Sequence, residues 1–229
     1  MCDFGYIKRN LDEIFGEISM LAQAYSQSPV RLVSVTKSAT DEEVLALLGF
    51  GASDIGENRP QMLMARAELA GRGGFNPTLH EIGTLQRNKV RLIGARVGLI
   101  HSVDSIALAR QIDRVSGELG RKTPILIELN SAREINKGGV MPEDTEALFS
   151  EILKLQCLSP MGLMTMGPAV PNEEIRPYFR LTKKIYDTIN ERYGWQGGGV
   201  LSMGMSSSYR TAIEEGATLV RIGRGLFVK

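Results

Sequence analysis

Short apolar runs rich in β-branched residues alternate along the chain with longer amphipathic segments. The short runs predict eight strands, and every run except the last is followed by a segment with helical spacing of its apolar positions. The predicted strands span residues 30–35, 54–57, 79–83, 98–103, 124–130, 160–166, 200–204 and 219–222. This alternation indicates parallel pairing, because each helix returns the chain to the same edge of the sheet.

A leading helix over residues 3–27 is predicted before the first strand. Its apolar positions recur at helical spacing and form one stripe that can be buried: Ile7, Leu11, Ile14, Phe15, Ile18, Leu21, Ala22 and Tyr25. Later helix starts are indicated by Thr40 followed by Glu43, by the acidic turn 142–144 and by the acidic turn 172–174.

Eight strand and helix units are enough to close a (β/α)8 barrel of the TIM type. The length of 229 residues suits one such domain, spanning residues 1–229, with the additional N-terminal helix outside it. A doubly wound open sheet is the structural alternative. No G-x-G-x-x-G turn follows the first predicted strand, so the usual reason to prefer a dinucleotide-binding fold is missing.

Composition narrows the classes of partner. The 27 basic residues nearly balance the 26 acidic ones, so the net charge of +1 supplies no field that would attract nucleic acid or anionic lipid. The start of the chain lacks the pattern of a signal peptide, and no run reaches the ~18 apolar residues of a membrane span. We therefore expect a cytoplasmic protein without nucleic-acid or membrane partners. Cys2 and Cys157 have no metal-ligand spacing and are expected to be reduced.

Lys37 is the first candidate for chemistry, because it directly follows the first predicted strand. Reactive residues of such barrels sit at the carboxyl ends of the strands, where desolvation or a neighbouring cation can turn a lysine into a Schiff-base amine. Other polar residues at predicted strand ends are Glu57, Asn58, Asn130, Thr165 and Ser206. Taken alone, Lys37 is more simply interpreted as a solvated lysine just beyond a strand.

Two segments near the end of the chain are typical of a phosphate site. The serine-rich segment 202–208 leaves the seventh strand and enters a helix, and the segment 221–225 carries Gly223 and Gly225 after the eighth strand. Phosphate often binds after strands 7 and 8 of such barrels, where backbone can approach an oxyanion. The alternatives are serines that merely cap a helix and a simple tight turn.

Successive side chains of a strand point to opposite faces, and this alternation predicts the direction of the Arg221 side chain. If Val220 and Ile222 face the surrounding helices, Arg221 points into the barrel and needs an acceptor or an anion to offset its desolvation. Glu128 is the competing structural partner.

Seven ordered blocks resemble one known family. They are VSVTK at 33–37, IGENR at 55–59 with Gln61, HEIG at 80–83 with LQRNK at 85–89, VDS at 103–105, GLMT at 162–165, LSMGMS at 201–206 and VRIG at 220–223. The set resembles the YggS/PROSC pyridoxal phosphate homeostasis proteins over nearly the whole chain. This resemblance implies an alanine-racemase-like barrel that carries pyridoxal 5′-phosphate (PLP) as a lysine imine.

The resemblance also assigns roles to individual residues. Lys37 matches the Schiff-base lysine and Arg221 the arginine near the pyridine nitrogen. Ser206 and the backbone of Gly223 and Arg224 match the family's phosphate contacts. Asn58 and His80 match two further positions near the cofactor, although a lone histidine on a strand is equally consistent with a structural role.

The chain departs from the family pattern at two positions near the expected phosphate. Ser208 stands where the family usually has aspartate, and Arg224 stands where it usually has threonine. Ser207 or Ser208 are candidates to replace the missing hydroxyl, and Arg224 to supply charge.

The function that the resemblance implies is intracellular vitamin B6 homeostasis without catalytic turnover. PLP-dependent apo-enzymes are candidate partners, and a monomer or weak dimer is expected. The alternatives are a PLP-dependent amino-acid racemase and a Schiff-base aldolase that pairs Lys37 with Glu57 or Glu128 as proton-transfer group.

Overall fold

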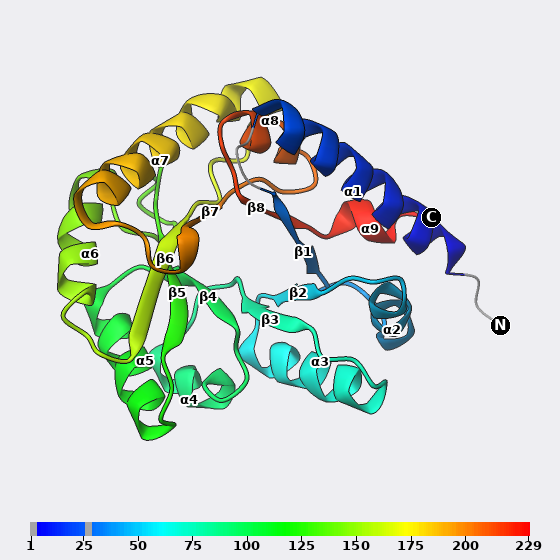
Figure 1. Ribbon diagram of the computed structural model, residues 1–229, viewed down its shortest axis with the longest axis horizontal. Helices are drawn as coiled ribbons and strands as arrows, with labels where there is room; N and C mark the ends of the chain where they lie inside the picture. Colours follow the sequence, from blue (N-terminus) through cyan, green and yellow to red (C-terminus); the bar gives the residue numbers. More distant parts are fainter. Residues whose placement is uncertain (1–3, 26–28) are drawn as a thin grey trace.

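The computed structural model describes residues 4–25 and 29–229, and it contains a closed barrel of eight parallel strands in sequential order. Strand β8 pairs with β1 and closes the ring, and the helices surround it (Figure 1). The predicted TIM-type barrel is thereby confirmed. An open sheet is excluded, because β1 would then lack its pairing with β8.

The strands are β1 (Arg31–Val35), β2 (Asp54–Glu57), β3 (Thr78–Glu81), β4 (Leu99–Val103), β5 (Thr123–Glu128), β6 (Leu158–Met164), β7 (Val200–Ser202) and β8 (Leu219–Ile222). The α-helices are α1 (Gly5–Tyr25), α2 (Asp41–Gly49), α3 (Pro60–Arg72), α4 (Val90–Ile93), α5 (Ile106–Glu118), α6 (Thr145–Ile152), α7 (Asn172–Tyr193), α8 (Tyr209–Glu214) and α9 (Arg224–Phe227). Short 3₁₀ turns are η1 (Arg87–Lys89), η2 (Pro142–Asp144) and η3 (Gln196–Gly198).

The leading helix α1 lies along the outside of the barrel beside α8 and α9 (Figure 1). Its buried stripe contains Ile7, Leu11, Ile14 and Ile18. On its polar side, Glu17 accepts hydrogen bonds from both Tyr209 and Arg210 of α8. The first residue and the last two residues of the predicted helix, like Cys2, lie outside the described residues. Cys157 is a free thiol.

Helix starts follow the predicted signals. The Thr40 hydroxyl accepts from the Glu43 backbone N–H, and the Glu43 carboxylate accepts from the Thr40 N–H, which together form a capping box. The acidic turn 142–144 forms η2 and leads into α6, and α7 begins at Asn172. The last strand differs from the prediction, because the short helix α9 follows it.

Four strands end two residues earlier than predicted, always at the carboxyl end. Strands β3, β5, β6 and β7 end at Glu81, Glu128, Met164 and Ser202, whereas the sequence pattern extends to positions 83, 130, 166 and 204. The residues beyond these ends belong to the mouth of the barrel. There the backbone leaves the ladder while several side chains stay partly covered.

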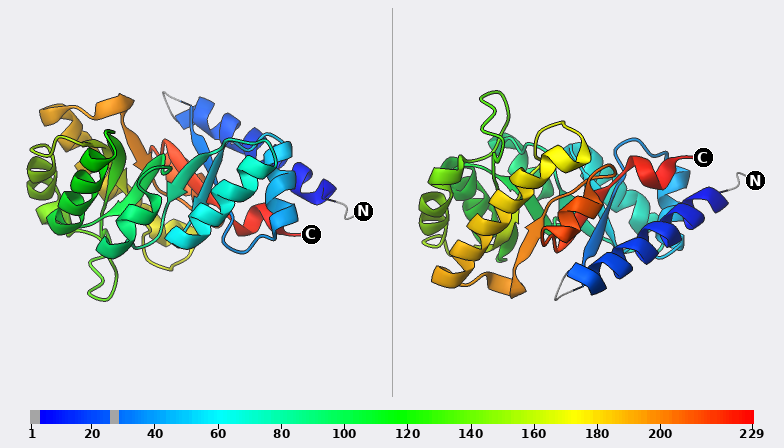
Figure 2. Two further views of the ribbon diagram at one scale, coloured as in Figure 1. Left: turned by 90° about the horizontal axis from the view of Figure 1, so that it is seen from below. Right: turned by 90° about the horizontal axis from the view of Figure 1, so that it is seen from above.

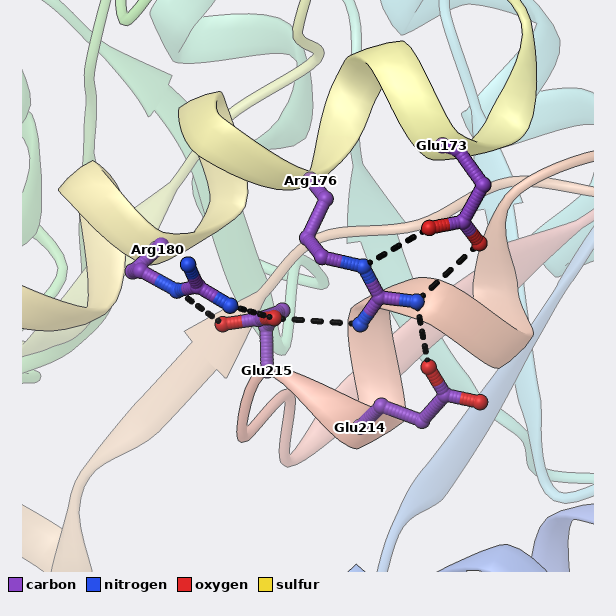
Figure 3. A network of polar contacts seen from close by, with 5 residues as sticks. All are labelled: Glu173, Arg176, Arg180, Glu214 and Glu215. Carbon is purple, nitrogen blue, oxygen red and sulfur yellow. Dashed lines mark hydrogen bonds and ion pairs between the residues drawn. The ribbon is translucent and has the colours of Figure 1, made fainter.

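An ion-pair network joins α7 to the end of α8 (Figure 3). Arg176 contacts Glu173, Glu214 and Glu215, and Arg180 also binds Glu215. Since α8 follows the serine-rich segment after β7, the network fixes one side of that segment against α7. In the described part of the chain, no helix is long and apolar enough to cross a membrane.

Candidate functional site

A cavity of about 480 Å³ opens at the carboxyl ends of the strands, and we call it the Lys37 cavity. The loops after β1, β5 and β6, coloured blue, green and yellow, project from this side of the barrel (Figure 2). Six of the seven residues proposed from the sequence line the cavity: Lys37, Asn58, Ser206, Arg221, Gly223 and Arg224. The barrel thus brings together positions that lie up to 187 residues apart in the sequence.

Arg66 of α3 holds the turn that carries Lys37 through hydrogen bonds to its backbone. The Arg66 guanidinium is almost fully buried, with its residue 4% exposed, and donates to the carbonyl oxygens of Ala39 at 2.6 Å and Thr36 at 3.4 Å. It also pairs with Asp41 and with Glu57, which in turn accepts from the Thr36 hydroxyl at 2.7 Å. These contacts hold the backbone on both sides of Lys37.

The Lys37 side chain is exposed to the cavity, and its Nζ has no hydrogen-bond or ion-pair partner among residues 4–25 and 29–229. A fixed backbone and an uncommitted amine are the features that a covalent lysine needs, because a carboxylate partner would hold the amine protonated.

Ser206 and the glycine turn form another part of the cavity wall. The Ser206 hydroxyl oxygen accepts from the backbone N–H groups of Gly223, at 3.3 Å, and Gly225, at 3.4 Å. A hydroxyl has two acceptor lone pairs and one proton. Both lone pairs are used here, so the proton is left to be donated to an anion in the cavity.

The helix after Ser206 contributes less than the sequence suggested. Helix α8 has six residues and begins at Tyr209, and the Ser208 hydroxyl accepts from the Met205 N–H, within its own turn. The Ser206 hydroxyl, held by the N–H groups of Gly223 and Gly225, is therefore the side-chain anion donor of this segment. At that turn a Cβ on Gly223 would lie 3.2 Å from the Val35 carbonyl oxygen, a close approach that favours glycine.

Arg224 adds a cation at this end. Its residue is exposed, it lines the Lys37 cavity, and its guanidinium has no hydrogen-bond or ion-pair partner within the described part of the chain. The positive charge is therefore free to face an anion, although solvent screens it.

Arg221 points into the barrel, as strand alternation predicted. It is buried, and its guanidinium donates to the Ser202 hydroxyl at 2.5 Å and to the Thr165 carbonyl oxygen at 3.0 Å. Burial lowers the pKa of Arg221 to about 10, against the opposing charge of Glu128. No hydrogen bond or ion pair joins Arg221 to Glu128 or to any other described carboxylate, so Glu128 does not act as its structural partner.

Asn58 stands at the mouth of the cavity directly after β2. The backbone of Gly83, after β3, packs against it so closely that a Cβ on Gly83 would lie 2.3 Å from the Asn58 carbonyl oxygen. This contact fixes the two loops that form one wall.

His80 is the predicted site residue that the structure places elsewhere. It is fully buried in the barrel interior and does not line the Lys37 cavity. Its Nε2 lies 2.8 Å from Asp54 Oδ1, and its Nδ1 lies 2.9 Å from His101 Nε2. The geometry is that of a structural histidine with two polar partners.

A second cavity of about 400 Å³, which we call the Glu128 cavity, adjoins the first and shares Thr84, Met166 and Met205 with it. It is lined by Glu128 and Lys137, and Asn130 and Thr165 also belong to it. Burial, together with the charge of Asp104, raises the pKa of Glu128 to about 7. Glu57 contributes to neither cavity, because its carboxylate faces Thr36 and Arg66.

Sequence reasoning missed part of the wall of the Lys37 cavity and its support. Val35, Ile82, Thr84 and Met166 line the cavity, and Arg66 braces it from behind. The four lining residues lie within two residues of predicted strand ends, which is the signal that could have found them. No local sequence pattern indicates the role of Arg66, because Glu57 lies nine positions earlier and its other partners lie 25 to 30 positions earlier.

Comparison with known proteins gives consistent results. The family described as "Alanine racemase, N-terminal domain" matches residues 10–229. A pyridoxal phosphate homeostasis protein of Aquifex aeolicus is 38% identical over 198 residues, which cover 86% of each chain. A crystal structure from Bifidobacterium adolescentis is 32% identical with a TM-score of 0.91 over 99% of this chain and 98% of that chain. PipY of Synechococcus elongatus PCC7942, solved with PLP bound, is 31% identical with a TM-score of 0.79 over 93% of this chain and 100% of PipY.

Proposed function

Because the chain belongs to the family of pyridoxal phosphate homeostasis proteins, within the wider alanine racemase N-terminal domain family, we propose that it binds PLP in the Lys37 cavity. The cofactor would be attached as an imine to Lys37 Nζ, formed by condensation of the amine with the PLP aldehyde and release of one water. When bound, PLP would supply an electrophilic carbonyl carbon that reacts with amines and a pyridine ring that withdraws electrons.

The residues present fit each part of PLP. The phosphate is assigned to the Ser206 hydroxyl proton, the backbone N–H of Arg224 and the Arg224 cation, with the Gly223 N–H holding the Ser206 oxygen in place. The pyridine nitrogen is assigned to the Arg221 guanidinium. Asn58 closes the mouth beside the ring. A volume of about 480 Å³ lies within the ~300 to 1,000 Å³ of small-molecule sites.

One observation carries this proposal. The uncommitted Lys37 amine and the anion-binding turn around Ser206 line the same cavity, and the buried Arg221 cation lines it too. An aldehyde that also bears a phosphate and a ring nitrogen matches this combination.

The test is borohydride reduction of the purified protein with added PLP, followed by mass spectrometry of its peptides. We expect one reduced adduct, on Lys37, and none in Lys37→Ala, which should stay folded because an exposed side chain contributes little packing. Lys137, which lines the adjoining cavity, provides the control through Lys137→Ala. An adduct confined to Lys137, or to any lysine other than Lys37, would contradict the proposal.

We also propose that the protein carries PLP without catalytic turnover. The homeostasis name of the relatives supports this role. An aldolase or racemase would need a second acid–base group beside Lys37, and Glu57 and Glu128 are the two candidates. Glu57 is turned away from both cavities, so Glu128 is the candidate that remains. Cytoplasmic location, action as a single domain, a monomeric or weakly dimeric state and delivery of PLP to apo-enzymes belong to the same proposal. Sedimentation with and without PLP measures the oligomeric state.

A further inference from the structure

A line of buried polar side chains crosses the interior of the barrel. Asp54 and Arg31 form an ion pair at the amino-terminal ends of β2 and β1. His80 Nε2 lies 2.8 Å from Asp54 Oδ1, His80 Nδ1 lies 2.9 Å from His101 Nε2, and His101 Nδ1 lies 3.1 Å from the Ser202 hydroxyl. Arg221 donates to that same hydroxyl at 2.5 Å. The line therefore begins at one face of the barrel and ends at the Lys37 cavity.

Closure of the barrel is what creates this line. His101 lies on β4 and Ser202 on β7, strands that are not neighbours in the ring, so their contact spans the interior. Apolar side chains of Val33, Leu99, Leu126 and Met164 fill the interior around the histidines. Hydrogen bonds in such surroundings are electrostatically stronger than in water, and each bond polarises the next.

The Arg221 end of the line is compatible with donation in one direction. Arginine only donates, so the Ser202 oxygen accepts from Arg221 and its proton is available for His101 Nδ1. If Ser202 donates to Nδ1, a neutral His101 donates through Nε2 to His80 Nδ1, and His80 Nε2–H donates to Asp54.

The Asp54 end fixes this direction. Burial favours its neutral acid, but the hydrogen bonds from His80 and Ser53 outweigh this effect and lower the pKa of Asp54 to about 2. An ionised Asp54 can only accept, so His80 must donate to it. Burial lowers the pKa of both histidines, which keeps both rings neutral and avoids two opposed N–H groups between them.

We propose that Asp54, His80, His101 and Ser202 form a one-directional hydrogen-bond relay that positions the Arg221 guanidinium and couples the amino-terminal face of the barrel to the cofactor. This inference rests on the proposed function for its effect on PLP. All four are positioning residues, because they act through Arg221. The buried Arg221 has no described ion-pair partner, and the relay instead turns the Ser202 oxygen towards it through a chain of hydrogen bonds that ends on the Asp54 carboxylate.

The first experiment measures the relay without PLP. The chain contains two histidines, so ¹⁵N-histidine labelling of the full-length protein gives signals from His80 and His101 only. At pH 7 we expect both rings as neutral Nε2–H tautomers. In Asp54→Asn, the signals of His101, which does not touch Asp54, should also shift. A doubly protonated ring, an Nδ1–H tautomer in the wild type, or unchanged His101 signals in Asp54→Asn would overturn the relay.

The second experiment measures its effect on the cofactor. We expect Ser202→Ala to raise the dissociation constant of PLP about tenfold, the scale of one hydrogen bond to a charged group, and to shift the visible absorption of the bound cofactor. Ser202→Thr, which keeps the hydroxyl, should restore both. The matched control is Ser102→Ala on β4, because Ser102 is equally buried but its hydroxyl has no hydrogen-bond partner among the described residues.

The outcomes separate the two proposals. Equal changes in Ser202→Ala and Ser102→Ala, or none in Ser202→Ala, would refute positioning by the relay even if Lys37 carries PLP. If the wild type forms no Lys37 adduct, the proposed function fails, and the tautomer measurement on cofactor-free protein still decides whether the relay exists.

Discussion

At the scale of single residues, removal of the Ser206 hydroxyl should weaken cofactor binding selectively. Its oxygen accepts from the N–H groups of Gly223 and Gly225, and its proton faces the cavity. We expect Ser206→Ala to weaken PLP binding by about 1 to 3 kcal/mol, as a hydrogen bond to a charged group is lost. Titration of the visible cofactor band measures this loss. Ser102→Ala is the control, since Ser102 lines neither cavity and its hydroxyl has no hydrogen-bond partner among the described residues.

Arg224→Thr should change PLP binding little, because the exposed guanidinium is screened by solvent and the substituted threonine supplies a hydroxyl. The same titration at low and high salt separates charge from hydroxyl. A loss larger than that of Ser206→Ala would show that Arg224 is the principal phosphate contact.

Glu81 gives a prediction about stability and pH. It is fully buried opposite Glu57 in the β2–β3 register, and Oε2 of each carboxyl has no described partner. Burial, with the charge of Glu57 adding, raises the pKa of Glu81 from 4.5 to about 8. Between these two values the folded state holds a proton that the unfolded state releases, so the free energy of unfolding falls as pH rises.

We therefore expect Glu81→Gln to gain stability relative to the wild type as pH rises from 5 to 8, and to gain no more above pH 8. The gain should be at most about 4 kcal/mol, from ~1.4 kcal/mol per pH unit. Urea unfolding at several pH values measures it, with the exposed Glu42→Gln as control. A difference that does not depend on pH would show that Glu81 is ionised in the folded protein.

At the scale of elements, the network between α7 and α8 is more than a set of surface pairs. Glu215 binds both Arg176 and Arg180, and its side chain is only 12% exposed (Figure 3). Isolated exposed pairs contribute ~0 to 1 kcal/mol, whereas networks with partly buried members do better. We expect Glu215→Gln to destabilise the protein by about 1 kcal/mol, with the loss shrinking in 1 M salt. Asp12→Asn, which breaks the exposed Lys8 pair, should have no measurable effect.

The elements also show where a sequence pattern stops being informative. Thr40 and Glu43 fixed the start of α2 because a capping box is local. The ends of β3 and β6 were predicted two residues too late, because the apolar Ile82 and Met166 continue the strand pattern while they line the cavities. Hydropathy predicts burial for such residues, although Met166 is 45% exposed. The pattern does not distinguish a residue that pairs in the sheet from one that lines a cavity.

At the scale of the whole molecule, the order of the strands was predictable because each strand and helix unit is local and joins its neighbour. Lys37, Ser206 and Arg221 could be assigned to one site because a closed barrel places β8 between β7 and β1. The relay could not be predicted. It depends on β4 facing β7 across the interior, and on His80 and His101 sharing the inward face, which no local pattern encodes.

The whole arrangement also argues against turnover. Two-base racemisation needs an acid–base group on each face of the reacting carbon, and under the proposed function Lys37 would supply one of them. Glu128 lies in the adjoining cavity, where its raised pKa of about 7 makes it the group to test for the other. Arg221 remains protonated, since its pKa is about 10, and it would offer the pyridine nitrogen a hydrogen bond rather than a transferable proton. PLP held in this way would be a weak electron sink.

We therefore expect no appreciable exchange at Cα when the PLP-loaded protein is incubated with L- or D-alanine in D₂O. Nuclear magnetic resonance of the amino acid measures the exchange, and chiral chromatography measures inversion. Lys37→Ala and Glu128→Gln, loaded with PLP in the same way, set the background, because each lacks one candidate group.

Exchange with inversion that is present in the wild type and absent from both variants would establish a racemase with Lys37 and Glu128 as its two acid–base groups. Exchange that only Lys37→Ala abolishes would instead indicate a one-base reaction. Equal background in all three proteins is the result that the buried Arg221 and the offset position of Glu128 lead us to expect.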